Sequence, residues 1–225
     1  MKIRGERVLV VAPHPDDEIL GVGGTIAKLA DDGCEVTVLT VAGHLPPLYP
    51  AGVYERTVEE ARKAHEIVGV RNAVFLDIPA TMIGDVPVHE LNGRILDVVK
   101  DVQPTVVFCS YPDRHVDHRL VFDSVLVATR PVSVGAQIRI LAAYETLSET
   151  HWNAPHIEPN FTPNWVVDIT DCVERKREAL MNYASQVQPF PGPRSVEAAM
   201  ALATLRGTQA GFAFGEGLHL IRMWS

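Results

Sequence analysis

The chain has 225 residues, of which 47% are hydrophobic and 21% charged, and its formal net charge is -8. This composition is that of an ordinary globular protein, and the acidic balance argues against a nucleic-acid partner, because phosphate binding requires a basic surface. The three cysteines, Cys34, Cys109 and Cys172, lie far apart and form no C-x-x-C pair. That spacing excludes a cysteine-based zinc module and gives no sign of a disulfide framework.

The first residues hold only a short apolar run, and carboxylates follow it directly in "MKIRGERVLVVAPHPDDE". Neither a signal peptide nor a membrane span has this pattern. We therefore expect a cytoplasmic protein with no membrane span. The length suits one ample domain, and we expect a single domain over residues 1–225.

Short apolar runs alternate with amphipathic segments through the first half of the chain. The runs are continuous and rich in valine, which is typical of strands buried on both faces of a parallel sheet. The expected elements are, in order, strand Arg7–Ala12, helix Ile19–Asp32, strand Cys34–Gly43, helix Tyr54–Val70, strand Asn72–Ile78, helix Val88–Val102 and strand Thr105–Ser110. This alternation predicts βαβ units, and hence an α/β fold in which helices flank a mostly parallel sheet on both faces.

The second half of the chain is less regular. The expected elements are helix Leu120–Thr129, strand Ile138–Thr146, strand Trp165–Asp168, helix Asp171–Gln186 with Asp171 as its N-cap, and helix Val196–Leu205. Long loops at Gly43–Gly52 and Thr146–Asn164, and a Pro/Gly loop at Gln188–Ser195, separate or follow these elements. Loops of this kind are where binding sites are often built.

Two clusters of histidine and carboxylate side chains follow expected strands. "HPDDE" begins at His14, directly after the first strand, and "HVDH" ends at His118, after the strand Thr105–Ser110. Because ligands of open α/β sheets bind outside the carboxyl ends of the strands, we expect the two clusters to converge at that edge. Buried carboxylates this close together repel one another unless a cation neutralises them, which favours a metal site.

The residue types of the clusters suit a catalytic metal ion. Catalytic zinc usually takes three protein ligands and keeps one position open for water. His14 and Asp17 can reach one ion if Pro15 and Asp16 form a tight turn, and His118 could supply the third ligand. Asp16 would then be free to act as a base toward metal-activated water.

The remaining polar residues of "HVDH" suit the stabilisation of a transition state. His115 could face the substrate and stabilise a developing oxyanion, and Asp117 could orient that imidazole and keep it charged.

The motif pair "APHPDDE" and "HVDH" resembles the LmbE-like, or PIG-L, family of zinc-dependent N-acetylglucosamine deacetylases. The resemblance covers roughly residues 7–130 and implies a Rossmann-like α/β fold. By the family pattern, His14, Asp17 and His118 would bind the metal, and Asp16 would be the general base. The ligand types suit Zn²⁺ and also iron, cobalt or nickel.

The family pattern also implies roles for three further residues. His115 matches the histidine that stabilises the tetrahedral intermediate, Asp117 its supporting carboxylate, and Arg56 an arginine that contacts the sugar. The chain departs from the pattern at Val116, where many members have proline, and at "GEGLHLI", which differs from the usual "AEAF". The family also includes trimers and hexamers, so the resemblance is compatible with a homo-oligomer.

Each feature also has a simpler interpretation. Acidic residues and proline favour the first turn of a helix, so "HPDDE" alone fits a helix N-terminus, and "HVDH" alone fits a polar loop. Arg56 suits an i,i+4 ion pair with Glu60 as well as a substrate contact. Trp152 and Trp165 suit either the core or a sugar-stacking surface. The sequence predicts that His65 packs in the core. His44, His151 and His156 lie in loops that could rim the site, although each is more simply a bystander.

We expect a zinc-dependent hydrolase that removes the N-acetyl group of a small GlcNAc-type sugar or conjugate and releases acetate. An amidase acting on a thiol-conjugated amino sugar would use the same ligands. A non-catalytic Rossmann-like binding module would need G-x-G-x-x-G in the first βα turn, whereas Gly21, Gly23 and Gly24 come after carboxylates that would repel a phosphate. A silent metal-binding sensor would not need the free carboxylate of Asp16.

Overall fold

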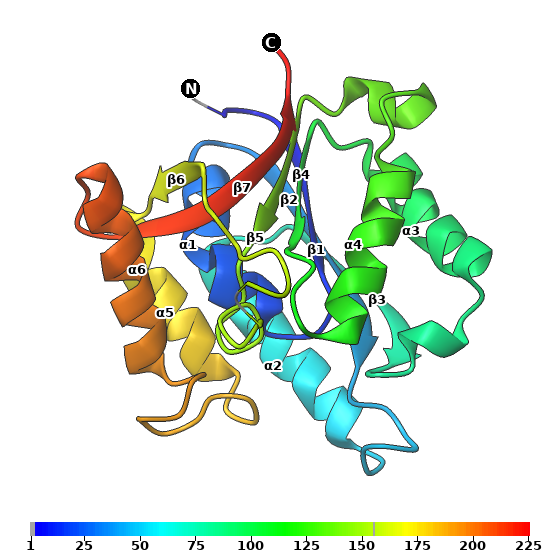
Figure 1. Cartoon of the computed structure of the whole chain (residues 1–225), viewed down its shortest axis with the longest axis horizontal. Helices are drawn as coiled ribbons and strands as arrows, with labels where there is room; N and C mark the ends of the chain where they lie inside the picture. The colour runs from blue at the N-terminus through cyan, green and yellow to red at the C-terminus, as the bar shows by residue number, and fades with distance from the viewer. Residues whose placement is uncertain (1–2, 155) are drawn as a thin grey trace.

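Seven strands form one sheet in the computed structural model, which describes residues 3–154 and 156–225 (Figure 1). The strands are β1 (Arg7–Ala12), β2 (Glu35–Gly43), β3 (Asn72–Pro79), β4 (Val106–Ser110), β5 (Ile140–Tyr144), β6 (Trp165–Asp168) and β7 (Gly215–Met223). Their order across the sheet is β3-β2-β1-β4-β5-β7-β6. Strands β1 to β5 are parallel, and β7 runs antiparallel to its neighbours β5 and β6.

Helices cover both faces of this sheet (Figure 1). The helices are α1 (Asp17–Asp31), α2 (Val53–Val68), α3 (Val88–Val102), α4 (Val116–Ala128), α5 (Val173–Asn182) and α6 (Val196–Ala210). Helices α3 and α4 pack on one face, and α1, α2, α5 and α6 lie on the other. The expected α/β fold with a mostly parallel, doubly covered sheet is therefore confirmed.

Strand β1 shows why the apolar runs of the sequence are continuous. Val8 and Val10 belong to the hydrophobic cluster beneath α1, α2 and α5, whereas Leu9 and Val11 belong to the cluster beneath α3 and α4. Side chains alternate between the two faces of a strand, so a strand covered on both faces needs apolar residues at every position. Each such side chain contributes about 1.5–3 kcal/mol when it is fully buried.

The helix boundaries differ from the expected ones in ways that matter for the site. Helix α1 begins at Asp17 rather than Ile19, and α4 begins at Val116 rather than Leu120. Carboxylates in a first turn interact favourably with the helix dipole, which explains why both acidic clusters open helices. The two clusters are therefore held by regular backbone rather than by loose loops.

Helix α5 is shorter than expected, and the expected N-cap of Asp171 is wrong. The helix begins at Val173 after a 3-10 turn, Thr170–Cys172, which contains Asp171. Asp168 satisfies the turn instead, because its side-chain oxygen accepts hydrogen bonds from the backbone N–H of Thr170 at 3.0 Å and from its hydroxyl at 2.7 Å.

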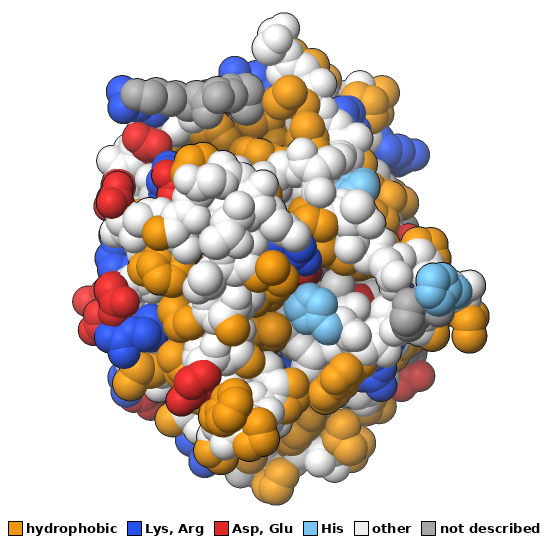
Figure 2. Space-filling model, turned by 60° about the vertical axis from the view of Figure 1, so that its left-hand side comes forward, with side chains coloured by type: hydrophobic (Ala, Val, Ile, Leu, Met, Phe, Trp, Pro, Cys, Tyr) orange, Lys and Arg blue, Asp and Glu red, His pale blue; other side chains and the backbone are white. Residues whose placement is uncertain are grey.

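On the face that Figure 2 shows, charged side chains of both signs lie mainly along the left-hand edge, and hydrophobic side chains are spread over much of the rest. This face does not carry the basic stripe that a nucleic acid requires. Among the described residues, we found no helix with the length and apolar content that crossing a membrane requires.

Candidate metal and catalytic site

The two predicted clusters converge at the carboxyl edge of the sheet. Strands β1 and β4 are direct neighbours, so the turns that follow them lie side by side. The ring centroids of His14, His115 and His118 lie 4.8 to 5.5 Å apart. Topology thus brings together side chains that are about a hundred positions apart, as the expected parallel order required.

The turn between β1 and α1 is tight and strained at Asp16. The backbone N–H of Asp17 donates to the carbonyl oxygen of His14 at 3.4 Å, and Asp16 has a φ of 114°. A positive φ at a residue other than glycine costs on the order of 1–3 kcal/mol, so neighbouring groups must hold this conformation. The expected turn through Pro15 and Asp16 is present.

A buried hydrogen-bond network centred on Glu18 supports this turn. The backbone N–H of Asp16 donates to Oε2 of Glu18 at 3.2 Å. The other oxygen of Glu18 accepts the hydroxyl of Tyr183 and contacts Nε2 of His65 at 3.0 Å. The expectation that His65 is a packed core residue is confirmed, and its partner is a carboxylate of the first motif.

Three atoms are arranged as metal ligands would be. Oδ2 of Asp17 lies 3.3 Å from Nδ1 of His14 and 3.3 Å from Nε2 of His118. A tetrahedral zinc site with bonds of about 2.0–2.1 Å has edges of roughly 3.3–3.4 Å between its ligand atoms. Nε2 of His118 and Oδ1 of Asp17 are buried and have no hydrogen-bond partner among the described residues. Buried polar atoms are normally paired, so the three residues fit a bound cation.

A second set of three side chains is also compact enough to hold a metal ion. The ligating atoms of His14, His115 and His118 all lie within 4.8 Å of one another. This set shares two members with the first and replaces Asp17 by His115. The two 3.3 Å distances favour Asp17, and His115 is half-buried whereas His14 and His118 are buried. That arrangement leaves His115 free of the metal ion.

Outer carboxylates fix which nitrogen of each imidazole is free. Nε2 of His14 donates to Oδ2 of Asp117 at 2.8 Å, and Nδ1 of His118 donates to Oδ2 of Asp113 at 3.0 Å. Each histidine therefore presents its other nitrogen toward Asp17. Metal-ligating histidines almost always bind a carboxylate or carbonyl in this way, because it orients the ring and raises its basicity.

Asp113 is a further residue of the site and lies outside those that the motifs predicted. Its carboxylate accepts three hydrogen bonds: from His118, from the backbone N–H of His115 at 2.9 Å and from the hydroxyl of Thr150 at 2.9 Å. The available signal was a carboxylate two positions before His115 in the same loop, together with the rule that a ligand histidine needs a second acceptor.

Asp117 has a different partner from the one expected. Its Oδ2 accepts from His14 and from the backbone N–H of Thr81 at 2.7 Å, whereas its own N–H donates to Nδ1 of His115 at 3.2 Å. The expected support of His115 by this carboxylate is therefore replaced by a backbone contact. Burial lowers the pKa of His115, and the neighbouring His14 and His118 lower it further, which favours the neutral ring.

Electrostatics at the three proposed ligand positions favour a cation. Burial alone would raise the pKa of Asp17, but the charge and hydrogen bonds of His118 and His14 hold it well below its ordinary range. Burial alone would lower the pKa of His118, but the Asp17 and Asp113 carboxylates raise it to about 10. The negative field that holds a proton there also attracts a metal ion.

Asp16 stands apart from these ligands and has its own partner. Burial raises its pKa to about 7, although the Arg194 guanidinium opposes this shift. Nη1 of Arg194 lies 3.2 Å from Oδ2 of Asp16, and Oδ1 of Asp16 is buried without a partner among the described residues. Arg194 lies outside the residues that the motifs predicted, and its only signal in the sequence is its position in a Pro/Gly loop.

Arg56 and His44 lie outside the central cluster of histidines and carboxylates. Arg56 lies on α2 and is exposed, and its expected ion-pair partner Glu60 instead accepts hydrogen bonds from Ser185, with the hydroxyl at 2.5 Å. Arg56 is close enough to act on His44: burial lowers the pKa of His44 to about 4, and the charges of His14, Arg194 and Arg56 act in the same direction. His44 therefore belongs to the surroundings of the site.

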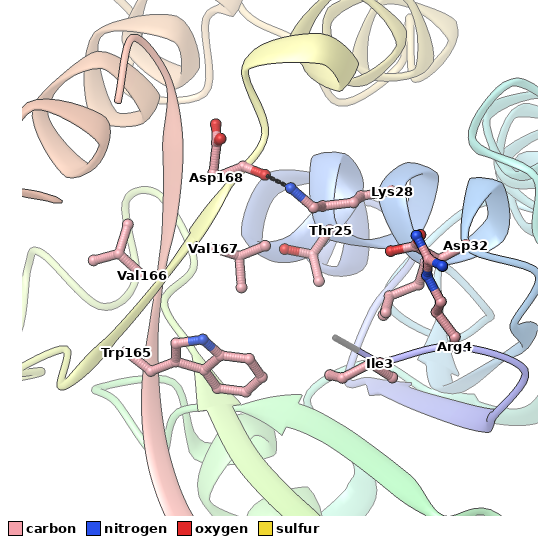
Figure 3. A pocket seen from close by; sticks show the side chains of 10 residues that line it. Ile3, Arg4, Thr25, Lys28, Asp32, Trp165, Val166, Val167 and Asp168 are labelled. Atoms are coloured by element: carbon pink, nitrogen blue, oxygen red, sulfur yellow. Dashed lines mark hydrogen bonds and ion pairs between the residues drawn. The ribbon is translucent and has the colours of Figure 1, made fainter. Parts of the chain in front are cut away.

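The two tryptophans occupy different places. Trp165 is half-buried against Phe108 and lines a cavity of about 430 Å³ (Figure 3). That cavity lies along the C-terminal half of α1, where Lys28 donates to the carbonyl oxygen of Asp168 at 2.6 Å. Trp152 is 56% exposed and lines a cavity beside Arg194.

Comparisons with known proteins agree with this site. The family model described as PIG-L, GlcNAc-PI de-N-acetylase, matches residues 9–129. A curated relative is the diacetylchitobiose deacetylase of Thermococcus kodakarensis, which is 27% identical over 96% of this chain and 83% of its own length.

Solved structures share the fold over nearly the whole chain. The conserved protein TT1542 of Thermus thermophilus has a TM-score of 0.78 at 27% identity, and the match covers 95% of this chain and 94% of that one. The 4-carboxy-2-hydroxymuconate hydratase GalB of Pseudomonas putida has a TM-score of 0.76 at 23% identity, covering 97% of each chain. The similarity to GalB shows the fold alone, because one fold can host several reactions. The family match over more than half of the chain decides the class: the chain belongs to the PIG-L family of de-N-acetylases, which confirms the expected enzyme class.

Proposed function

We propose that the chain is a zinc-dependent hydrolase that removes the N-acetyl group from a GlcNAc-type sugar or conjugate and releases acetate. One observation carries the proposal: Oδ2 of Asp17 lies 3.3 Å from a nitrogen of both His14 and His118, and the buried carboxylate of Asp16 comes from the same turn. The activity named for the relative from Thermococcus kodakarensis supports the choice of an amino-sugar amide.

His14, Asp17 and His118 would hold the metal ion. A bound zinc ion supplies Lewis-acid polarisation of the amide carbonyl and lowers the pKa of water to about 7. Asp113 and Asp117 hold the rings of His118 and His14 in the orientation that this requires.

Asp16 would act as general base and then as general acid. Its carboxylate takes a proton from the attacking water as the new C–O bond forms at the acetyl carbon. It then returns that proton to the nitrogen as the C–N bond breaks, so acetate and a free amino sugar leave. A pKa of about 7 suits both steps, because a catalytic group works best near the ambient pH.

His115 would stabilise the charge that develops on the acetyl oxygen. Its Nδ1 accepts the backbone N–H of Asp117, so Nε2 carries the hydrogen and can donate it to the substrate. The lowered pKa of His115 favours a neutral donor over the imidazolium that the sequence analysis expected. Arg56 stays a proposed sugar contact, and a trimer or hexamer and a cytoplasmic location stay predictions.

Acetate release is the direct test. The panel is GlcNAc, a GlcNAc α-glycoside, N,N′-diacetylchitobiose and UDP-GlcNAc, assayed before chelation, after chelation and after zinc is added back. We expect at least one substrate to turn over, chelation to abolish turnover and zinc to restore it. Asp16→Asn should lower kcat by about 10²-fold or more, since general acid–base catalysis contributes about 10²–10⁴-fold.

Two results would contradict this proposal. Full activity after exhaustive chelation would exclude the metal-dependent mechanism. Stoichiometric zinc binding without turnover of any panel member would exclude the proposed substrates, and would favour a thiol-conjugated amino sugar or a non-catalytic role.

A further inference from the structure

A cavity of about 300 Å³ adjoins the proposed catalytic base. Its lining includes Ser148, Glu149, Trp152, Gln186, Gln188 and Arg194. Arg194 forms a wall common to the cavity and the site, because its Nη1 lies 3.2 Å from Asp16 and its Nε donates to the hydroxyl of Ser148 at 3.2 Å. The volume is at the lower end of the range of about 300–1,000 Å³ typical of small-molecule sites, so one additional ring fits this space.

Trp152 is exposed on a loop that is otherwise firmly anchored. Its backbone N–H donates to the carbonyl oxygen of Ser148 at 2.9 Å. Two nearby residues of the loop are also hydrogen-bonded, since Thr150 donates to Asp113 at 2.9 Å and Asn153 donates to the carbonyl oxygen of Pro159 at 3.0 Å. The indole is thus a large apolar surface that is 56% exposed and projects from an anchored backbone. A rigid aromatic loses little conformational entropy when it binds a ligand.

Ion pairs near this cavity leave its charges balanced. Arg114 donates to Oε2 of Glu149 at 2.6 Å and also lies 5.8 Å from the centre of the Trp152 ring. Arg194 faces both Asp16 and Glu149, the latter at 3.6 Å. Two guanidinium groups therefore face two carboxylates. An anionic group would find no unpaired cation among these four side chains, whereas a neutral ligand would not disturb the pairs.

The chemistry of the lining matches a sugar ring. A pyranose presents apolar C–H groups on its faces and hydroxyl groups around its edge. An indole suits the faces, and amide side chains such as Gln186 and Gln188, which both donate and accept hydrogen bonds, suit the edge. Trp165 lines its cavity with Lys28 and Asp168 along the far half of α1, and does not adjoin Asp16 in this way.

We propose that the Trp152 cavity is a subsite for a neutral sugar ring linked to the GlcNAc that loses its acetyl group. The inference rests on the proposed function and narrows its substrate to a neutral glycoside or oligosaccharide of GlcNAc. Trp152 is then a specificity-determining residue that binds the second ring and takes no part in the chemistry at the acetyl group.

Kinetics on the zinc-loaded enzyme test this assignment. Trp152→Ala should raise KM for N,N′-diacetylchitobiose about tenfold with little change in kcat, because it removes the apolar face on which the second ring would lie. The kcat/KM for free GlcNAc should change by less than about twofold. Trp152→Phe should recover much of the loss. The matched control is Trp224→Ala, because Trp224 is 48% exposed but lies at the end of the chain, where its ring donates to Ile138.

Calorimetric binding separates this proposal from the proposed function. N,N′-diacetylchitobiose and GlcNAc are titrated into Asp16→Asn protein with and without Trp152→Ala. A preference for the disaccharide that disappears with Trp152→Ala supports the subsite even if wild-type enzyme releases no acetate from either sugar. The subsite is overturned, even if deacetylation is confirmed, if Trp152→Ala weakens the binding of both sugars equally. It is also overturned if Trp152→Ala leaves the preference for the disaccharide unchanged. Tighter binding of UDP-GlcNAc than of the disaccharide would also overturn it, because it would indicate an anionic occupant.

Discussion

Nη1 of Arg194 lies 3.2 Å from Oδ2 of Asp16, although 178 positions separate the two residues. The contact joins the Pro/Gly loop before α6 to the turn after β1. It places a half-buried cation against the buried carboxylate proposed as general base, and so it affects how readily that carboxylate ionises. Burial raises the pKa of Asp16 to about 7, and the charge of Arg194 keeps the pKa from rising further.

Replacing Arg194 should therefore change the pH dependence of the reaction. Arg194→Met removes the charge that favours ionised Asp16, so the pKa of Asp16 rises and less of it is ionised at neutral pH. The acidic limb of the kcat/KM profile should move to higher pH. If it moves by about one pH unit, the activity at pH 7 should fall by up to about tenfold. Arg194→Lys should restore part of the effect. Arg177→Ala, at an exposed ion pair on α5, is the control. An acidic limb at its wild-type position in Arg194→Met would refute the coupling.

Asp113 should control metal affinity without being a ligand. Asp113→Asn retains an oxygen that can accept the N–H of His115 but replaces the acceptor of His118 Nδ1 by a donor. We expect zinc affinity to fall by about 10–100-fold, the usual effect of losing an outer carboxylate. Competition with a chromophoric chelator measures the change. Asp123→Asn, on the exposed side of α4, should leave the affinity as it is. Equal affinities for the two variants would rule out this role.

Replacing a helical glycine by alanine should lower the stability of the protein at Gly21 and raise it at Gly93. A Cβ at Gly21 would overlap the ring of Tyr144 and lie 2.9 Å from the carbonyl oxygen of Glu145, so Gly21→Ala should destabilise by about 1–3 kcal/mol or more. A Cβ at Gly93 meets nothing within 4 Å, so Gly93→Ala should stabilise by about 0.4–1 kcal/mol through the unfolded state. Urea unfolding of both variants is the measurement, and equal signs would contradict the packing of α1 on Tyr144.

The ion pair of Glu145 with Arg206 should make stability depend on pH. Both side chains are largely buried, and the two carboxylate oxygens accept hydrogen bonds of 2.7 Å from Nε and Nη2. Burial alone would raise the pKa of Glu145, but the hydrogen bonds from Arg206 and His151 hold it below its ordinary value of 4.5. A depressed carboxyl pKa stabilises the fold above the unfolded value, and that stabilisation is lost as pH falls through the folded value.

Arg206→Met should therefore lower the free energy of unfolding by about 3–5 kcal/mol at pH 7, because it leaves Glu145 buried without its main partner. As pH falls, the difference from wild type should begin to narrow above pH 4.5, because the buried, unpaired Glu145 of the variant takes up a proton there. It should go on narrowing until pH passes the lowered pKa of Glu145 in the wild type. Urea titrations at a series of pH values give both quantities. A difference that stays constant down to pH 4 and below would show that the pair does not carry this dependence.

Much of the fold and the centre of the site followed from local order in the sequence. The continuous valine-rich runs at Arg7–Ala12 and Val106–Ser110 indicate buried parallel strands, because only a doubly covered strand needs apolar residues on both faces. Parallel strands end at one edge, so the sequence predicts that both clusters lie at that edge. The pairing of β1 with β4 in the sheet then brings His14, Asp17 and His118 together.

Tertiary structure alone decided which side chains surround that centre. Arg194, Thr150 and Trp152 come from loops whose path depends on how α5, α6 and β7 pack, and no period or spacing in the sequence encodes that path. The same packing gave Asp117 the imidazole of His14 as its partner in place of His115. Sequence periodicity specifies burial and strand direction, because these depend on neighbours along the chain. Hydrogen-bond partners and cavity walls depend instead on distances between distant segments, which exist only after the chain has folded.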